Sequence, residues 1–469
     1  MTAEIAILNK LAVALAADSA VTISTGAREE KIFDSADKLF ELSRNDPIGI
    51  MIYNGMEFAE VPFQTIINKF RAECDAFRTV ENAASRFLHY LNSTGVGAPD
   101  RVKHNQIEQV VTPLLKKFEE RRQQAMIEYF QNIPSDAVAD QINMSILAIS
   151  NNILSNFKQA IDRLPDANFV GDGPLEFDDF TVNAIRRLVA ENLGMPTDSE
   201  EQLVELSKSY LTKGSLSSSL TGTVITGFGS GEIFPTLISY EIDGMACNRL
   251  KYMKTNAVDI DRQGKRAAVI PFAQKEMVER FLYGIDVSIQ NDISEFCVNS
   301  VNTLTESLLS RVQFDDPSAK QELEREAQSA EQAFIEGLTQ KSFQAIRSAQ
   351  QAEIEDMVEF MPKPELAKMA EALVNLTSIK RKVSRGFETV GGPIDVAVIS
   401  QSEGFIWVKR KHYFDPELNA RYFQRAQSKQ NRLQETAHAT ASDIGPSSGP
   451  TDGQRDAEAS IEQQAGPPR

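Results

Sequence analysis

Cysteine and histidine are scarce in this sequence. Its 469 residues include three cysteines, Cys74, Cys247 and Cys297, and four histidines. The cysteines lie far apart without a C-x-x-C spacing, and no H-E-x-x-H motif occurs. A disulfide framework and a structural zinc site are therefore not expected, and we expect no metal or other cofactor. Isolated cysteines usually pack in the interior, so a thiol nucleophile is disfavoured.

Long apolar runs are absent as well. No stretch approaches the roughly 20 apolar residues that a transmembrane helix needs. The N-terminal segment has neither the basic region nor the cleavage site of a secretory signal. We therefore expect a cytoplasmic protein.

Positive charge is in deficit, because the formal net charge is −17. Nonspecific binding to nucleic acid or to an anionic membrane is disfavoured, since phosphates would have to be neutralised by local basic patches. The candidates are two basic triplets, Lys380–Lys382 and Lys409–Lys411. Each is too short to outweigh the overall field, and a solvated surface is predicted for both. Neither nucleic acid nor a membrane is an expected partner.

The motifs of common nucleotide-binding and serine-hydrolase folds are also missing. The glycines of GFGSGE, 227–232, follow a predicted strand, but the next segment contains Pro235 and is typical of a second strand. It lacks the helix start that would hold a pyrophosphate, so a hairpin turn is predicted. The G-x-S-x-G match at 445–449 lies in a polar tail, where no nucleophile elbow is expected.

The sequence does contain alternating strand-like and helix-like blocks. Apolar strand segments occur between residues 3 and 54, between 220 and 270, and in the closing segment GGPIDVAVISQSEGFIWV, whereas helical periodicity dominates the regions between them. This order predicts an α+β fold, in which a mostly antiparallel pair of sheets is covered by helices. Several strands are apolar nearly throughout, which favours sheets buried on both faces, as in a four-layer sandwich.

The chain opens with MTAEIAILNKLAVALAADSAVTIS, which predicts two buried strands joined by a tight turn at Asn9-Lys10. Removal of the initiator Met would leave Thr2 first, joining a hydroxyl nucleophile to its own α-amine, which at a pKa of about 8 is the expected general base. Asp18 ends the second strand, and Lys38 opens KLFEL, the predicted third strand. If these strands pair in one sheet, Lys38 would lower the pKa of the amine and Asp18 would orient Lys38. A turn-capping Asp18 and a solvated Lys38 are the alternatives.

These segments resemble, in chain order, the β-type subunits of proteasomes, which are N-terminal-nucleophile (Ntn) hydrolases. Asp18 lies sixteen positions after Thr2, as in that family. The other matching segments are KLFEL, IGIMIYNG, TGTVITGFG with TLISYEIDG, and GGPIDVAVISQSEGFIWV. The resemblance implies a divergent bacterial-type member with a four-layer αββα sandwich, enlarged by helical insertions.

The resemblance also implies roles for individual residues. Thr2 would be the nucleophile, and Asp18 and Lys38 would tune and orient it. A backbone N–H would stabilise the oxyanion, at Asn54 by a gap-free count or at Gly55 after a one-residue slip.

Two positions depart from the family pattern. Ile270 stands where the family has a serine, and Phe387 stands where an acidic residue is expected, with Glu388 one place away as a candidate member of the proton network. Both departures disfavour ordinary peptidase activity.

The resemblance divides the chain into core segments and additions. These are a first core segment, 1–94; a helical insertion, 95–215; a second core segment, 216–290; a second insertion, 291–365; a closing helix and hairpin, 366–428; and a disordered tail, 429–469. The implied function is threonine-type hydrolysis of a peptide or amide. The alternatives are an inactive proteasome-like scaffold or regulatory subunit, and a small-amide hydrolase of the same superfamily. A homo-oligomeric ring is the implied assembly, with an unfoldase or another protein as a further partner.

Overall fold

The structure is a computed structural model that describes residues 2–24, 30–133, 138–193, 197–217, 219–311, 317–383, 390–415 and 417–425. Phe387, Glu388 and the predicted tail 429–469 lie outside the described residues. Contacts divide the chain into two units, 1–411 and 412–469. A short 3-10 helix, η2 (Glu417–Asn419), belongs to the second unit, and the elements below belong to the first.

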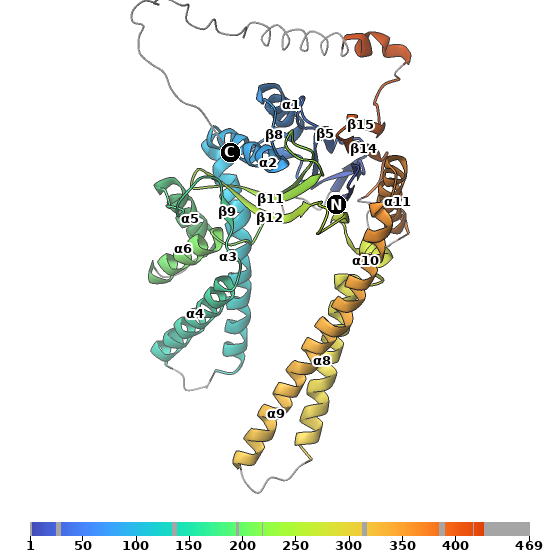
Figure 1. Cartoon of the computed structure of the whole chain (residues 1–469). Helices are drawn as coiled ribbons and strands as arrows, with labels where there is room; N and C mark the ends of the chain where they lie inside the picture. Colours follow the sequence, from blue (N-terminus) through green and yellow to red (C-terminus); the bar gives the residue numbers. More distant parts are fainter. Residues whose placement is uncertain are drawn as a thin grey trace, which may run out of the picture. The chain divides into compact units, whose positions relative to one another are not determined.

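A five-stranded antiparallel sheet contains the two ends of the first unit (Figure 1). Its strands, in spatial order, are β13 (Ala267–Ala273), β1 (Ala3–Asn9), β2 (Val13–Ala17), β14 (Asp395–Ser400) and β15 (Gly404–Lys409). The hairpins predicted at the start of the chain and in the closing segment are both present. In the first hairpin, the Asn9 amide donates to the Ala12 carbonyl at 3.0 Å, so that Lys10 and Leu11 form the turn.

A six-stranded antiparallel sheet is the second central element. Its order is β5 (Leu39–Glu41), β6 (Ile48–Asn54), β10 (Thr221–Gly227), β11 (Thr236–Ala246), β12 (Arg249–Asp259) and β9 (Asn168–Phe169). The GFGSGE segment lies in the connection between β10 and β11, in agreement with the predicted hairpin. The strand β12 was not predicted, because its lysines and polar residues interrupt any apolar run. Two small ribbons complete the strands, β3 (Val21–Ser24) with β4 (Glu30–Phe33) and β7 (Glu57–Phe58) with β8 (Val61–Pro62).

The inner strands of both sheets are buried on both faces, which explains their nearly continuous apolar sequences. Ala6 and Leu8 of β1 join a cluster with Met51 of β6 and Val224 of β10, so this cluster connects the two sheets. The alternate residue Ile5 faces the other way, into a cluster with α11. Successive side chains of a strand point to opposite faces, so one strand contributes to two apolar layers.

Helices pack on the sheets from sequence-distant segments. α1 (Phe63–Glu73) and α2 (Val80–Val96) share the cluster formed with the six-stranded sheet, and α11 (Lys363–Lys382) contacts β1, β2 and β14. The Thr79 hydroxyl accepts the Asn82 amide hydrogen bond at 3.1 Å and so caps α2 at its N-terminus. The structure thus has a mixed α+β fold with antiparallel sheets, as the sequence predicts.

Further helices form the regions between the strands. The first group is α3 (Asp100–Gln131), α4 (Ala139–Asp162), α5 (Asp179–Asn192) and α6 (Thr197–Leu211), which share a hydrophobic cluster of their own. The second group is α7 (Glu276–Tyr283), α8 (Val287–Leu309), α9 (Pro317–Glu336), the π-helix η1 (Gly337–Phe343) and α10 (Gln344–Glu359). The described helices include none long and apolar enough to cross a membrane.

Candidate active site

Thr2 lies immediately before β1 and is buried. Its hydroxyl donates a hydrogen bond to Oε2 of Glu4 at 3.1 Å, and its carbonyl accepts the Gln274 amide at 3.2 Å. Thr2 and Glu4 are two residues apart, so their side chains lie on the same face of the extended chain. The main chain therefore places a carboxylate directly beside the hydroxyl.

Asp18 lies one residue beyond β2 and binds three groups. Its Oδ1 atom accepts the Ala3 amide at 3.2 Å and the Lys38 ammonium at 2.5 Å, while Oδ2 accepts the Gly391 amide at 3.0 Å. These bonds link Asp18 to the first residues of β1 and to the segment before β14. The alternative of a local turn cap does not describe these long-range contacts.

Lys38 is the centre of a buried ionic network. Its Nζ atom is 2.5 Å from Oδ1 of Asp18 and 3.2 Å from Oε1 of Glu4, and all three side chains have no exposed surface. A solvated Lys38 is therefore excluded. The network connects the Thr2 hydroxyl through Glu4 to Lys38 and then to Asp18 (the Thr2 cluster hereafter).

The structure brings Thr2, Asp18 and Lys38 together by a route other than the one predicted. The sequence predicts that they meet on the condition that β1, β2 and KLFEL pair in one sheet. Instead, Lys38 immediately precedes β5 in the six-stranded sheet, while Thr2 and Asp18 adjoin β1 and β2 in the five-stranded sheet. Lys38 reaches across the interface between the sheets, so the three residues meet although the condition of a single sheet is not fulfilled.

Glu4 was not predicted as a site residue. Burial raises its pKa to about 7, against the lowering effect of Lys38, while the charge of Asp18 raises it further. The usable signal was a single carboxylate in the segment AEIAILN, whose other residues are apolar except for Asn9 at its end. A charge in a strand buried on both faces needs a partner, and that requirement points to Lys38.

A second polar group lies close to this cluster. Tyr53 of β6 donates a hydrogen bond to Oε1 of Glu241 at 3.4 Å, and its ring stacks obliquely on Phe272 at 5.7 Å between centroids. Burial, together with the charges of Glu241 and Glu4, raises the pKa of the Tyr53 phenol. Tyr53 therefore stays protonated and acts as a neutral neighbour of Glu4.

The two candidate oxyanion donors differ in their surroundings. The Gly55 amide already donates to the Leu220 carbonyl at 3.2 Å, as an extension of the β6–β10 pairing. The Ile52 amide donates to the Lys38 carbonyl at 2.9 Å, and two residues on, the Asn54 amide lies on the same strand edge. Asn54 has φ of 62°. Of the two, Asn54 is the better placed relative to Lys38.

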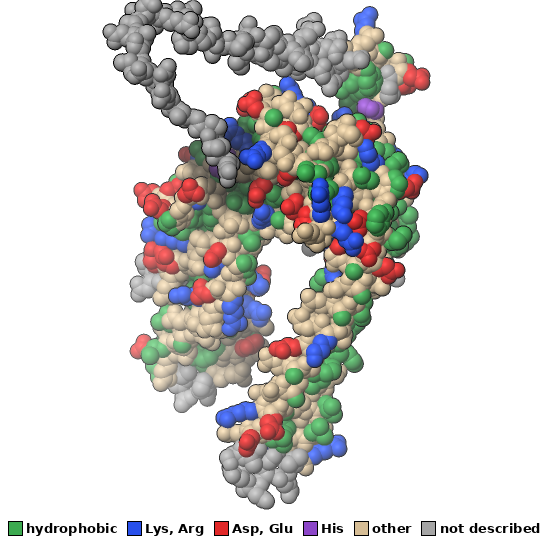
Figure 2. Space-filling model, in the orientation of Figure 1, with side chains coloured by type: hydrophobic (Ala, Val, Ile, Leu, Met, Phe, Trp, Pro, Cys, Tyr) green, Lys and Arg blue, Asp and Glu red, His purple; other side chains and the backbone are tan. Residues whose placement is uncertain are grey.

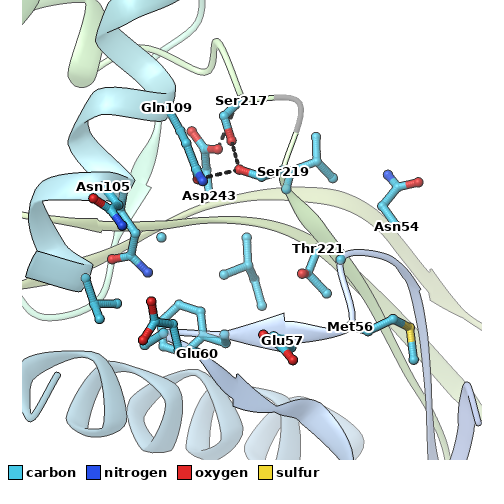
Figure 3. A pocket seen from close by; sticks show the side chains of 18 of the residues that line it. Asn54, Met56, Glu57, Glu60, Asn105, Gln109, Ser217, Ser219, Thr221 and Asp243 are labelled. Carbon is cyan, nitrogen blue, oxygen red and sulfur yellow. Dashed lines mark hydrogen bonds between the residues drawn. The ribbon is translucent and has the colours of Figure 1, made fainter. Parts of the chain in front are cut away.

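A cavity of about 820 Å³ opens at the end of β6. Val21, Asn54, Gly55 and Thr221 line one side of it, and Figure 3 shows the polar side chains of α3 and of the segment before β10 facing the same space. The lining residues that the structure describes do not include Thr2, Asp18 or Lys38. Two of the lining residues are close to the Thr2 cluster in the sequence or in the strand pairing, since Val21 follows Asp18 by three residues and Asn54 follows Ile52, whose amide binds the Lys38 carbonyl, by two.

Ser217 and Ser219 belong to the segment SLSSSL, whose composition is typical of a polar linker, but both side chains have defined partners. Their hydroxyls are 2.9 Å apart, and Ser219 donates to Gln109 at 2.6 Å. The Ser217 amide donates to Oδ1 of buried Asp243 at 2.8 Å, and Lys251 lies 3.2 Å from the other carboxylate oxygen. This ordered polar wall of the cavity includes a contact across more than 100 residues, which local pattern does not reveal.

Of the two positions that depart from the pattern of the resemblance, Ile270 lies among the described residues. Ile270 lies in β13 opposite Ala6 of β1, and packs against the apolar cluster between the sheets. Gln274, one residue beyond β13, is buried next to Thr2, and its Oε1 atom accepts a 2.6 Å hydrogen bond from Arg381. Gln274 is thus a polar neighbour of Thr2 that was not predicted from the sequence.

Thiols and metals offer no competing site among the residues that the structure describes. Cys74, Cys247 and Cys297 are free and partly exposed rather than fully buried. Burial nevertheless raises the pKa of Cys74 and of Cys247, which disfavours the thiolate. Within the described residues, no group of three or more His, Cys, Asp or Glu side chains has the arrangement of a metal site.

Comparisons with known proteins add little to this geometry. No family model matches the chain, and no curated protein matches it. Among solved structures, the chain is similar to the "Anbu (Gly-1) mutant" from Hyphomicrobium sp. strain MC1, with 10% sequence identity and a TM-score of 0.24, over 95% of this chain and 98% of that chain. A TM-score at this level carries no argument about fold or function. The functional argument therefore rests on the residues themselves.

Proposed function

We propose that the chain is a threonine-type N-terminal-nucleophile amide hydrolase with Thr2 as its nucleophile. The observation that carries this proposal is the buried chain of contacts from the Thr2 hydroxyl through Glu4 to Lys38 and Asp18. Burying charges is unfavourable, so a lysine held between two carboxylates beside a hydroxyl is a poor arrangement for a purely structural purpose.

The proposed reaction proceeds through an ester on Thr2. The hydroxyl oxygen attacks the amide carbonyl, the amine departs, and water then hydrolyses the acyl-enzyme. Loss of Met1 would supply a free α-amine, which serves as the base in the mechanism expected from the sequence. Lys38 stabilises negative charge on Oγ1, Asp18 holds Lys38, and the Asn54 amide is the preferred donor to the oxyanion.

The finer fold assignment belongs to the same proposal. We infer a four-layer αββα sandwich of the proteasome type, in a divergent bacterial-type member of that family. The shared apolar cluster between the sheets and the helices on their outer faces support this arrangement. The order of the matching sequence segments supports it independently.

The cavity at the end of β6 is the proposed substrate site. Its volume of about 820 Å³ is within the range of about 300–1,000 Å³ that is usual for small-molecule sites. Amide and hydroxyl side chains on its wall, among them Asn105, Gln109 and Ser219, offer both donors and acceptors to a peptide-like ligand. A short peptide or a small amide therefore suits the site better than a folded protein.

The test is intact-protein mass spectrometry before and after incubation with a β-lactone probe. We expect a protein without Met1 that gains one probe mass, with no gain in Thr2→Ala and retained labelling in Thr2→Ser. Retention of Met1, or a processed protein that ignores the probe, would contradict the proposal. Small-amide and casein substrates would then separate an amidase from a protease.

A second candidate function is an inactive oligomeric scaffold, and one specific observation favours it. No residue of α8 is buried among those described, and Phe296 and Leu304 of this helix are 71% and 60% exposed. Figure 2 shows hydrophobic side chains gathered along the pair formed by α8 and α9. Such a surface is typical of an interface, here with a second copy of the chain.

A further inference from the structure

We infer that the Glu4 carboxylate, rather than the α-amine of Thr2, takes the proton from the Thr2 hydroxyl. This inference rests on the proposed function and identifies a catalytic residue that was not predicted from the sequence. Glu4 touches the reacting atom itself, because its Oε2 atom accepts the hydrogen bond from Oγ1 of Thr2 at 3.1 Å.

The position of the Glu4 carboxylate is suitable for a general base. A candidate general base must lie within hydrogen-bonding reach of the proton that it abstracts, and Glu4 already does. Its second oxygen is 3.2 Å from Nζ of Lys38, which is held in turn by Asp18. The carboxylate therefore bridges the hydroxyl and the ammonium, with no exposed surface on its side chain. Its position follows from β1 itself, since Glu4 is two residues from Thr2 on the same face.

The surroundings set the proton affinity of Glu4. Lys38 and Asp18 act on it from the ends of β5 and β2, and the Thr2 hydroxyl donates a hydrogen bond to it from the same strand end, whereas the Tyr53 phenol on β6 is protonated and carries no charge. On β13, Phe272 lies opposite Glu4 and carries no titratable group. Burial raises the pKa of Glu4 to about 7, so the group can both accept and return a proton near neutral pH.

Each step balances with water as the co-reactant. The Oγ1–H proton moves to Oε2 of Glu4 as Oγ1 bonds to the carbonyl carbon. The C–N bond then breaks, and Glu4 returns the proton to the departing amine, which leaves an ester on Thr2. Water attacks the ester and gives a proton to Glu4. The C–O bond breaks, and that proton returns to Oγ1.

The experiment measures the rate of β-lactone labelling of Thr2 against pH in the full-length protein. We expect the wild-type rate to rise through an apparent pKa near 7. Glu4→Gln should label about 100-fold more slowly or worse at about pH 7.5 and lose this transition, in line with the usual contribution of a general base. Glu4→Asp, with a shorter arm, should fall between the two.

The matched control is Glu241→Gln on β11, which removes a neighbouring carboxylate whose hydrogen bond goes to Tyr53 rather than to Thr2. It should label at the wild-type rate. If Glu4→Gln keeps the wild-type rate and pH profile, the α-amine is the base and the inference is overturned. If Glu4→Gln does not fold, a wild-type labelling rate and pH profile in Glu4→Asp would overturn the inference instead. A processed wild-type protein that does not label at all would instead refute the proposed function.

Discussion

At the scale of single residues, the main feature of the site is the buried carboxylate of Glu4 in β1. Glu4 lies in a strand whose other side chains are apolar except for Asn9 at its end, and its side chain is fully buried with those of Lys38 and Asp18. A buried ion pair contributes little net stability compared with well-packed apolar residues. A need for stability therefore does not account for the Thr2 cluster, which supports the proposed chemistry at the Thr2 hydroxyl.

The raised pKa of Glu4 predicts a specific pH dependence of stability. In the folded protein Glu4 keeps its proton up to about pH 7, whereas the unfolded chain releases it near the ordinary value of 4.5. Between these values the folded state binds more protons, so the free energy of unfolding falls as pH rises. The total contribution lost across this window is about 3 kcal/mol, at about 1.36 kcal/mol for each pKa unit.

Urea unfolding at about pH 4.5 and about pH 7.5 tests this expectation. The stability of the wild type relative to Glu4→Gln should decrease by about 3 kcal/mol between the two pH values. Thr2→Ala is the control, since it keeps Glu4 and should keep the pH dependence while removing the nucleophile. A difference between wild type and Glu4→Gln that is the same at both pH values would show that Glu4 does not titrate in this way.

At the scale of elements, one side chain connects the first hairpin to a helix far away in the sequence. The Nδ2 atom of Asn9 donates to the carbonyls of Val358 and Met361, each at 2.9 Å. Its Oδ1 atom accepts the amides of Leu11 and Ala12 at 2.9 and 3.2 Å. The Asn9 side chain thus binds backbone groups of the turn and of the C-terminal end of α10 at the same time. These hydrogen bonds explain why a polar residue lies at the end of a buried strand.

Asn9→Leu should destabilise the protein markedly. The substitution keeps a similar volume but leaves the Met361 carbonyl and the Leu11 and Ala12 amides without the Asn9 partner, while the Val358 carbonyl keeps the Met361 amide, and each buried orphan costs about 1–3 kcal/mol. We expect a loss of at least about 3 kcal/mol in the free energy of unfolding, measured by urea titration. Leu11→Asn is the control, because Leu11 is 55% exposed in the same turn and should change stability by less than about 0.5 kcal/mol. Equal effects of the two substitutions would contradict this role for Asn9.

The contrast between β1 and β12 shows how far the sequence alone reaches. Apolar runs of the β1 and β14 type predict strands because both faces are buried, and both hairpins were predicted on that basis. β12 carries two lysines, of which Lys254 is exposed, and owes its pairing to β11 and β9, so its own residues gave no signal. In the site, Asp18 and Lys38 were predicted. The sheet to which Lys38 belongs, and its contact with Glu4, were not, because both depend on tertiary packing that a local sequence pattern does not contain.

At the scale of the whole molecule, the two groups of helices outside the sheets differ in how much apolar surface they bury. α3 to α6 bury a cluster of their own, but α8 contacts α9 and η1 without burying any of its described residues. In Figure 1, α8 and α9 run side by side. Isolated helices are marginal in water and usually gain stability by packing an apolar face. Ile293, Phe296, Leu304 and Leu308 recur at intervals of three, eight and four on α8 and remain exposed.

Self-association through this face is the last prediction. Sedimentation should give the wild type a mass above the 52.0 kDa of a single chain. In the double variant Phe296→Glu and Leu304→Glu, the loss of two apolar anchors should weaken association by about 2–4 kcal/mol, or about 30- to 1,000-fold. Glutamate is a better helix former than phenylalanine, so α8 itself should persist. The control Met144→Glu changes an equally exposed side chain on α4 and should sediment as the wild type does. A wild type at the single-chain mass over a wide concentration range, or a double variant that keeps the larger mass, would remove this face as the interface and leave catalysis at Thr2 as the better explanation of the fold.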